Sequence, residues 1–170
     1  MITADLDRFV ARARACAPDF GPATARAAFL VTPEGFARAE ESAQDNRYMA
    51  AADNYHGEAA LAEHRALQRA LSADLPVFAF PGDPATPDAV FPNNVFAIAR
   101  PDAQVLPQAP PRLLVGRMRH AVRQREAARA DIRGFFTGVL GCRELDLSRQ
   151  PHPCELTGAL VIDRARGLGY

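Results

Sequence analysis

Apolar residues recur at helical spacing in three segments of the chain. In residues 3–17 they share one face and acidic residues lie near the start, so we expect an opening helix that stops before Pro18. Residues 57–72 show the same spacing and predict a second helix. Residues 118–140 are also periodic, although Gly134 argues against one unbroken helix there.

Short apolar runs bounded by proline or polar residues predict strands. They lie at residues 27–31, 75–80, 90–99, 113–115, 144–147 and 156–163, the last entering a turn at 163–167. Strands alternating with helices are typical of an α/β fold. The proline-rich segment 81–88 cannot continue the second strand, because proline lacks a ladder donor, and we expect a loop that delivers Asp88.

Composition is that of one ordinary globular domain. Of the 170 residues 48% are apolar, and 20 basic and 20 acidic residues cancel, which argues against nucleic-acid and membrane-surface roles. The sequence has no apolar run of roughly 18 residues and no signal-like start. The three cysteines, Cys16, Cys142 and Cys154, form no CxxC pair, so we expect a reducing cytoplasm and neither a disulfide framework nor a zinc ribbon or finger.

The most informative stretch is residues 86–94, TPDAVFPNN, where a carboxylate and two carboxamides follow a stiff loop. Asp88, Asn93 and Asn94 can supply the in-plane acceptors and donors that a guanidinium or ureido group needs. The alternative is an ordinary turn, since Asp and Asn beside proline are common loop residues. On these residues alone, the turn is the commoner outcome.

Two further features offer weaker candidates. Glu155 stands at the mouth of an apolar run and could transfer protons or hold a cation, although a solvated acid at a strand end is more usual. An arginine run could hold a substrate carboxylate, although a solvated helix face is the usual meaning of such a run. It consists of Arg117, Arg119, Arg123, Arg125 and Arg129.

Four stretches, taken in order, resemble the pentein superfamily of guanidine-modifying enzymes. They are VTPEGFARAEESAQDN (31–46), PDAVFPNNV (87–95), RQRE (123–126) before a DI pair, and ELTGALVIDR (155–164). The nearest resemblance is to the citrulline hydrolase-like, dimethylarginine dimethylaminohydrolase-related and amidinotransferase-like branch. It implies an α/β propeller of ββαβ modules, of which residues 1–170 would form one domain, the N-terminal part.

The resemblance also implies roles for individual residues. Asp88 would lie against the guanidino or ureido group of an arginine- or citrulline-like ligand, with Phe91 as a wall. Glu155 would be the acid that orients the reacting group, and Arg123, or alternatively Arg125, would hold a carboxylate. Relatives that hydrolyse methylated arginine carry two acids where Asn93 and Asn94 stand, so the amides favour a neutral ureido group.

In this superfamily a cysteine nucleophile and a histidine follow the segment that corresponds to Glu155, and neither can be placed here. We therefore expect part of a hydrolase or amidinotransferase-like protein that is inactive alone. The resemblance implies a reaction through a covalent cysteine intermediate, with no cofactor and no metal. A noncatalytic amino-acid-binding or assembly module is the alternative. A homodimer could cover the open propeller, because an opened fold leaves strand edges and apolar faces exposed.

Overall fold

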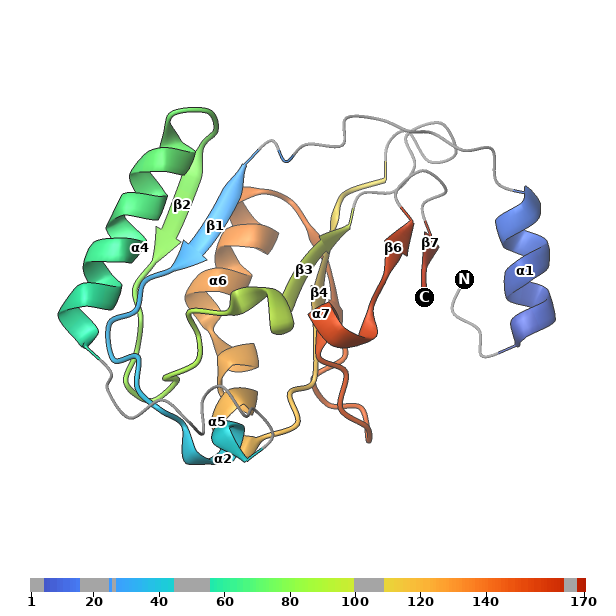
Figure 1. Ribbon diagram of the computed structural model, residues 1–170. Coiled ribbons are helices and arrows are strands. Elements are labelled where there is room, and N and C mark those ends of the chain that lie inside the picture. The colour runs from blue at the N-terminus through green and yellow to red at the C-terminus, as the bar shows by residue number, and fades with distance from the viewer. Residues whose placement is uncertain (1–4, 16–24, 26, 45–55, 100–108, 164–167) are drawn as a thin grey trace.

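The computed structural model describes residues 5–15, 25, 27–44, 56–99, 109–163 and 168–170 (Figure 1). Its longer helices are α1 (Leu6–Ala15) and α4 (Gly57–Ser72), and short helical pieces lie between the strands. These pieces are α2 (Glu40–Ala43), η1 (Pro92–Asn94), α5 (Ala121–Gln124), η2 (Glu126–Ala128), α6 (Ala130–Gly134), η3 (Phe135–Val139) and α7 (Leu156–Ala159).

Among the described residues, seven short strands form three small sheets. The strands are β1 (Ala28–Val31), β2 (Val77–Phe80), β3 (Phe96–Ala99), β4 (Arg112–Val115), β5 (Arg143–Asp146), β6 (Ile162–Asp163) and β7 (Leu168–Gly169). β1 and β2 pair in parallel, β4 pairs antiparallel with β3 and parallel with β5, and β6 and β7 form an antiparallel pair. Parallel neighbours need a crossover, which α4 supplies for β1–β2 and the 121–139 helices supply for β4–β5.

The core lies where the two larger sheets face the helical segment 121–139. In Figure 1, α4 runs along the β1–β2 pair while α6 lies behind the sheets. Fully buried side chains come from both sheets and from this segment, among them Val31, Leu113, Val115, Met118 and Ile132. Phenylalanine rings join β1 to η3, with Phe29 and Phe136 edge to face at a centroid distance of 4.9 Å.

The structure confirms most of the expected elements. The helix at 57–72 has the predicted bounds, and the opening helix lies within residues 3–17. The predicted strands at 27–31, 75–80, 113–115 and 144–147 correspond to β1, β2, β4 and β5. The mixed α/β fold is thus correct, and β3, β4, the 121–139 helices and β5 follow one another in the order ββαβ.

Two predicted strands are wrong in their first halves. At 90–99 the chain forms η1 before β3, because Pro92 fixes its own φ and offers no N–H to a neighbouring strand. At 156–163 residues Leu156–Ala159 form α7, whose amides bond locally to Glu155 and Leu156 rather than across a sheet. The periodic segment 118–140 is broken into four helical pieces, and most of the turn expected at 163–167 lies outside the described residues.

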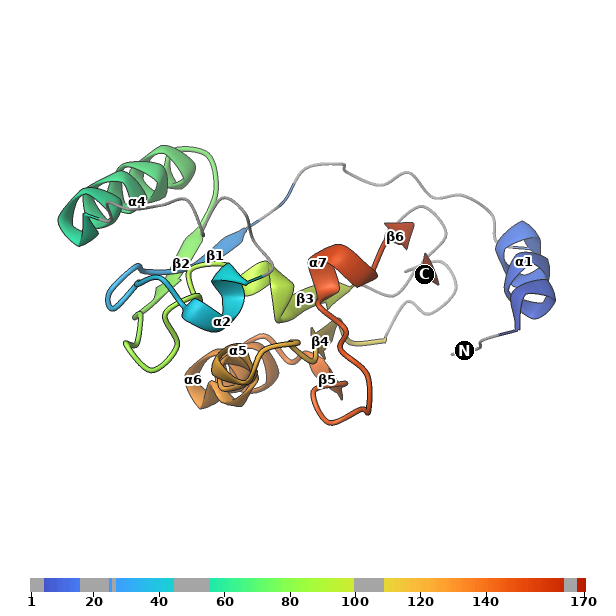
Figure 2. The same cartoon turned by 60° about the horizontal axis from the view of Figure 1, so that its bottom comes forward.

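Figure 2 shows α5 and α6 on one side of the β3–β4–β5 sheet and α7 beyond its other side. The site residues predicted from sequence therefore lie on loops and short helices around this sheet. Within the part of the chain that the structure describes, no helix is long and apolar enough to cross a bilayer.

Candidate functional site

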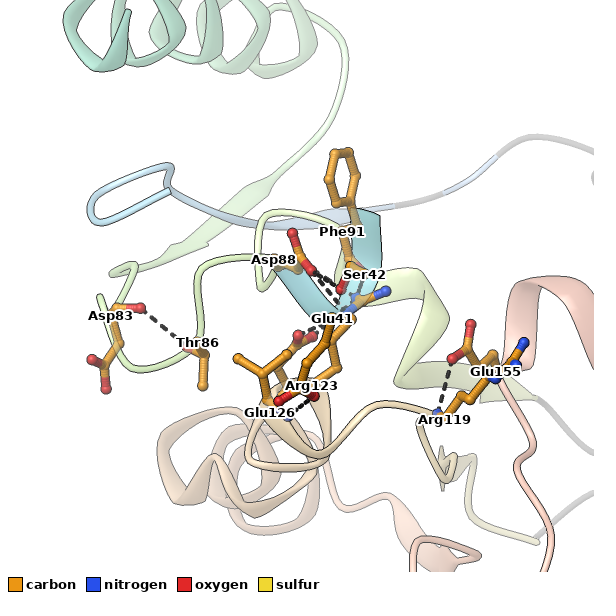
Figure 3. Close-up of polar contacts among 11 residues, drawn as sticks. Glu41, Ser42, Asp83, Thr86, Asp88, Phe91, Arg119, Arg123, Glu126 and Glu155 are labelled. Carbon is orange, nitrogen blue, oxygen red and sulfur yellow. Dashed lines mark hydrogen bonds and ion pairs between the residues drawn. The ribbon is translucent and has the colours of Figure 1, made fainter. Parts of the chain in front are cut away.

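Asp88 sits in a series of tight turns between β2 and β3. The Thr86 amide donates to the Asp83 carbonyl at 2.8 Å, and the Phe91 amide donates to the Asp88 carbonyl at 3.0 Å. Pro87 and Pro92 restrict the backbone on both sides of this turn. The turns direct the Asp88 side chain inward, and the residue is only 2% exposed (Figure 3).

The two oxygens of the Asp88 carboxylate have different surroundings. Oδ2 accepts a hydrogen bond of 2.6 Å from the Ser42 hydroxyl of α2. Oδ1 is buried and has no hydrogen-bond partner among the residues that the structure describes. A buried acceptor without a donor is costly, so this oxygen is the natural place for a ligand N–H.

Arg123 and Glu126 form a buried pair beside Asp88. Arg123 Nε and Nη2 donate to the two Glu126 carboxylate oxygens at 2.8 and 3.1 Å, which is a bidentate contact. Arg123 Nε also lies 3.9 Å from Asp88 Oδ2. The three side chains thus form one cluster (Figure 3), which carries two carboxyl groups and one guanidinium.

Burial raises the pKa of Glu126 above its ordinary value of 4.5, because the charged form loses its hydration. The hydrogen bond and positive charge of Arg123 act in the opposite direction. The negative charges of Asp88 and Glu155 add to the rise. Burial thus favours the neutral form of Glu126, while Arg123 favours its charged form.

Glu155 lies apart from this cluster, at the start of α7 (Figure 3). It is half-buried, and its Oε1 accepts a hydrogen bond of 3.0 Å from the Arg119 amide. Three residues after Arg119, the Val122 amide donates to Glu41 Oε2 of α2 at 3.2 Å. Two acids from distant parts of the chain thus fix the backbone that leads into α5.

The side chains of Phe91 and Asn93, both expected beside Asp88, contact other residues. Phe91 is 47% exposed and packs edge to face against Phe36, with ring centroids 6.1 Å apart. Asn93 is exposed and its Nδ2 donates to Thr157 Oγ1 at 2.8 Å, while Asn94 is half-buried in η1. The structure therefore brings Asp88 and Arg123 together, and joins the two asparagines to α7 and η1 instead.

The arginine run does not share one face. Arg123 is buried, Arg117 donates to the Gln150 carbonyl, and Arg129 binds Asp131 and the Pro81 carbonyl. Arg125 is exposed. The five arginines therefore do not form a single solvated helix face, because the guanidinium groups of Arg117, Arg123 and Arg129 bind other parts of the chain.

Sequence reasoning assigned no role to Glu126, Ser42 or Glu41. Glu126 had a usable signal, because an acid three residues after an arginine on a helix can pair with it. Ser42 and Glu41 had none, since their partners lie 46 and 81 residues away along the chain.

Residues 32–168 match a family model described as N,N dimethylarginine dimethylhydrolase, eukaryotic. The match covers well over half of the 170 residues and includes the whole cluster around Asp88. The chain belongs to this family. No curated protein matches the chain.

Solved structures share the fold of this family member. The N-terminal domain of ArgZ, a cyanobacterial arginine dihydrolase captured as a mutant with its substrate, matches with a TM-score of 0.62 and 18% identity. This match covers 81% of the present chain and 45% of the ArgZ chain. A mutant of AgrE in complex with L-arginine matches with a TM-score of 0.60 and 18% identity, over 84% and 19% of the two chains.

The chain thus spans less than half the length of the solved chains that it matches. Together with the family match, these structures confirm the resemblance to the N-terminal part of pentein-type, arginine-modifying enzymes.

Proposed function

We propose that this chain is the substrate-binding part of a hydrolase or amidinotransferase that acts at the guanidino or ureido carbon of an arginine- or citrulline-like amino acid. The observation that carries the proposal is the buried Asp88 Oδ1, which has no donor among the described residues. A guanidinium presents N–H groups in one plane and a positive charge, so it would satisfy this oxygen.

The charge of the cluster favours a guanidinium over a neutral ureido group. Asp88 and Glu126 supply two carboxyl groups, and Arg123 supplies one guanidinium. The carboxyl groups outnumber the guanidinium, so a cationic ligand would complement this cluster better than a neutral one. The amide of Asn93, which argued for a ureido group, is already bonded to Thr157.

Phe91 would be a wall of the site, as the resemblance implies, and its exposed ring, on the same turn as Asp88, packs against Phe36. For the ligand carboxylate we favour Arg125 over Arg123. Two donor groups of Arg123 are committed to Glu126, whereas Arg125 is exposed. Glu155 would orient the reacting group, as the family motif implies.

Isothermal titration calorimetry with L-arginine, L-citrulline and dimethylarginine tests this proposal. We expect L-arginine to bind more tightly than L-citrulline, and Asp88→Asn to abolish the binding. Asp131→Asn is the matched control, because Asp131 also pairs with an arginine but lies outside the cluster. No heat at millimolar L-arginine, or equal binding by Asp88→Asn, would overturn the proposal.

We also propose that residues 1–170 bind the ligand but do not catalyse its conversion. In the family a cysteine and a histidine beyond the segment of Glu155 perform the chemistry, and neither can be matched within the 170 residues. Measurable turnover of L-arginine, L-citrulline or dimethylarginine that Glu155→Gln abolishes would contradict this. Binding without turnover also fits a noncatalytic binding or assembly module on the same scaffold.

We propose that the chain forms part of an α/β propeller, as the resemblance implies, and that a second copy of the chain covers its open side. Supporting it, Phe78 of β2 is 37% exposed, and Val139 and Leu140 at the end of η3 are 72% and 45% exposed. Exposed apolar side chains on neighbouring elements favour association. Light scattering that finds a single monomeric species at all concentrations would contradict it.

We place the protein in the cytoplasm, again as a proposal. Cys154 is a free thiol in the structure. Free cysteines without disulfides are usual in a reducing compartment.

A further inference from the structure

Arg123 connects the 121–128 helical segment to the turn at residues 88–91. Its Nη2 lies 3.4 Å from the carbonyl oxygen of Asp88 and 3.4 Å from that of Phe91. These two carbonyls stand at the two ends of the turn that carries the ligand acceptor and the exposed ring. The guanidinium of Arg123 therefore contacts both ends of the turn.

Glu126 determines how this guanidinium is oriented. Both of its oxygens accept from Arg123, at 2.8 Å from Nε and 3.1 Å from Nη2, so the plane of the guanidinium is fixed. Glu126 is 2% exposed, and every hydrogen bond that we find for its side chain among the described residues comes from Arg123. A buried acid with this single partner acts on the site through that partner.

We propose that Glu126 is a positioning residue for ligand binding. It holds Arg123 so that Arg123 clamps the turn at residues 88–91, with Asp88 Oδ1 left free to accept from a ligand. The inference rests on the proposed function for its ligand, but the positioning of the turn does not depend on the ligand.

The chain contains a second pair of the same kind that serves as a matched control. Arg133 donates to both carboxylate oxygens of Glu144, at 2.9 Å from Nε to Oε2 and by a second, shorter bond from Nη2 to Oε1. This pair joins α6 to β5, and Arg133 also donates to Asp146 and to the Ala127 carbonyl of η2. Glu144→Gln therefore weakens a bidentate pair of the same kind while it leaves the hydrogen bonds from Arg123 to Glu126 and to the turn at residues 88–91 in place.

The first experiment needs no ligand. Nuclear magnetic resonance is used to follow the Arg123 Nε–H signal and the hydrogen exchange of the Phe91 amide, which donates to the Asp88 carbonyl. We expect Glu126→Gln to move the Nε–H signal and to lower protection of the Phe91 amide at least about tenfold relative to Glu144→Gln. Equal protection in the two variants would overturn the proposal, whatever the ligand data show.

The second experiment measures the Kd for L-arginine in the same variants. We expect Glu126→Gln to raise it about tenfold, the effect of weakening a charge-assisted contact, and Glu144→Gln to leave it unchanged. Glu126→Asp, which keeps the charge, should recover part of the affinity and serves if Glu126→Gln does not fold. An unchanged Kd in Glu126→Gln would overturn the positioning role.

The two proposals fail separately. If the unmodified chain binds no L-arginine but Glu126→Gln still loosens the Phe91 amide, the proposed ligand is wrong and the positioning of the turn stands. If the unmodified chain binds L-arginine through Asp88 and Glu126→Gln changes neither the amide nor the Kd, the proposed function stands and the role of Glu126 is refuted.

Discussion

Replacing Arg123 by methionine tests whether the buried cluster depends on its single positive charge. Methionine retains much of the length and volume of the side chain but leaves Asp88 and Glu126, each 2% exposed, without a counter-charge. Removing one partner of a buried ion pair costs about 3–5 kcal/mol. With an ordinary domain stability of about 5–15 kcal/mol, Arg123→Met should fold but be strongly destabilised.

The assay is urea unfolding followed by circular dichroism. A loss of about 4 kcal/mol with a slope of about 2 kcal/mol per molar lowers the midpoint by about 2 M urea. The control is Arg133→Met, which removes an arginine whose partners Glu144 and Asp146 have side chains 26% and 28% exposed. Water can solvate these acids once Arg133 is gone, so we expect that variant to lose about 1 kcal/mol at most.

The loss in Arg123→Met should also depend on pH. Burial raises the pKa of Glu126, and Arg123→Met removes the hydrogen bond and the positive charge that oppose this rise, so the pKa of Glu126 is higher still in the variant. A group with a raised pKa stabilises the folded chain at low pH and loses this contribution as pH rises through the folded value. Arg123→Met should therefore be less destabilised at about pH 5 than at about pH 8, and adding Glu126→Gln should recover part of the loss at the higher pH. Equal losses for Arg123→Met and Arg133→Met, or a loss that does not change with pH, would refute the reasoning.

Three further predictions concern the surrounding fold. Leu113→Ala removes a fully buried side chain from the central strand β4 and should cost about 2–5 kcal/mol in urea unfolding; a loss below about 1 kcal/mol would contradict the core assignment. Gly116→Ala would place a Cβ 2.9 Å from Leu156 Cγ and against the backbone that leads into α7, so it should lower the thermal midpoint and shift the amide signals of α7, whereas Gly138→Ala, with no atom near its added Cβ, should do neither. Hydrogen bonds from Arg129 lower the pKa of Asp131 below its ordinary 3.8, so the contribution of Asp131 to stability is present above that pH and lost on acidification. In Asp131→Asn the thermal midpoint should therefore fall less between neutral and acid pH than it does in the unmodified chain. An equal fall in the two proteins would contradict this.

Local sequence patterns predicted the elements whose form depends on neighbouring residues. The spacing of apolar residues in 57–72 predicted α4 with its observed bounds, and the apolar run at 27–31 predicted β1. The prediction was wrong at 156–159, where an apolar run forms α7 rather than a strand. An apolar run of this length does not distinguish a short buried helix from a strand, because both bury the same residue types.

The sequence by itself determined the α/β class and the resemblance to the pentein superfamily, and it singled out Asp88 as a candidate. Only the tertiary structure decided which groups face that carboxylate. Ser42 reaches it across 46 residues of chain, and Arg123, 35 residues beyond it, reaches its backbone. Such contacts follow from how the turn at residues 88–91, α2 and the 121–128 segment pack around one core, and no local periodicity encodes that packing. The same packing buries Glu126, and burial turned an acid that sequence reasoning had left without a role into the partner that holds Arg123 in place.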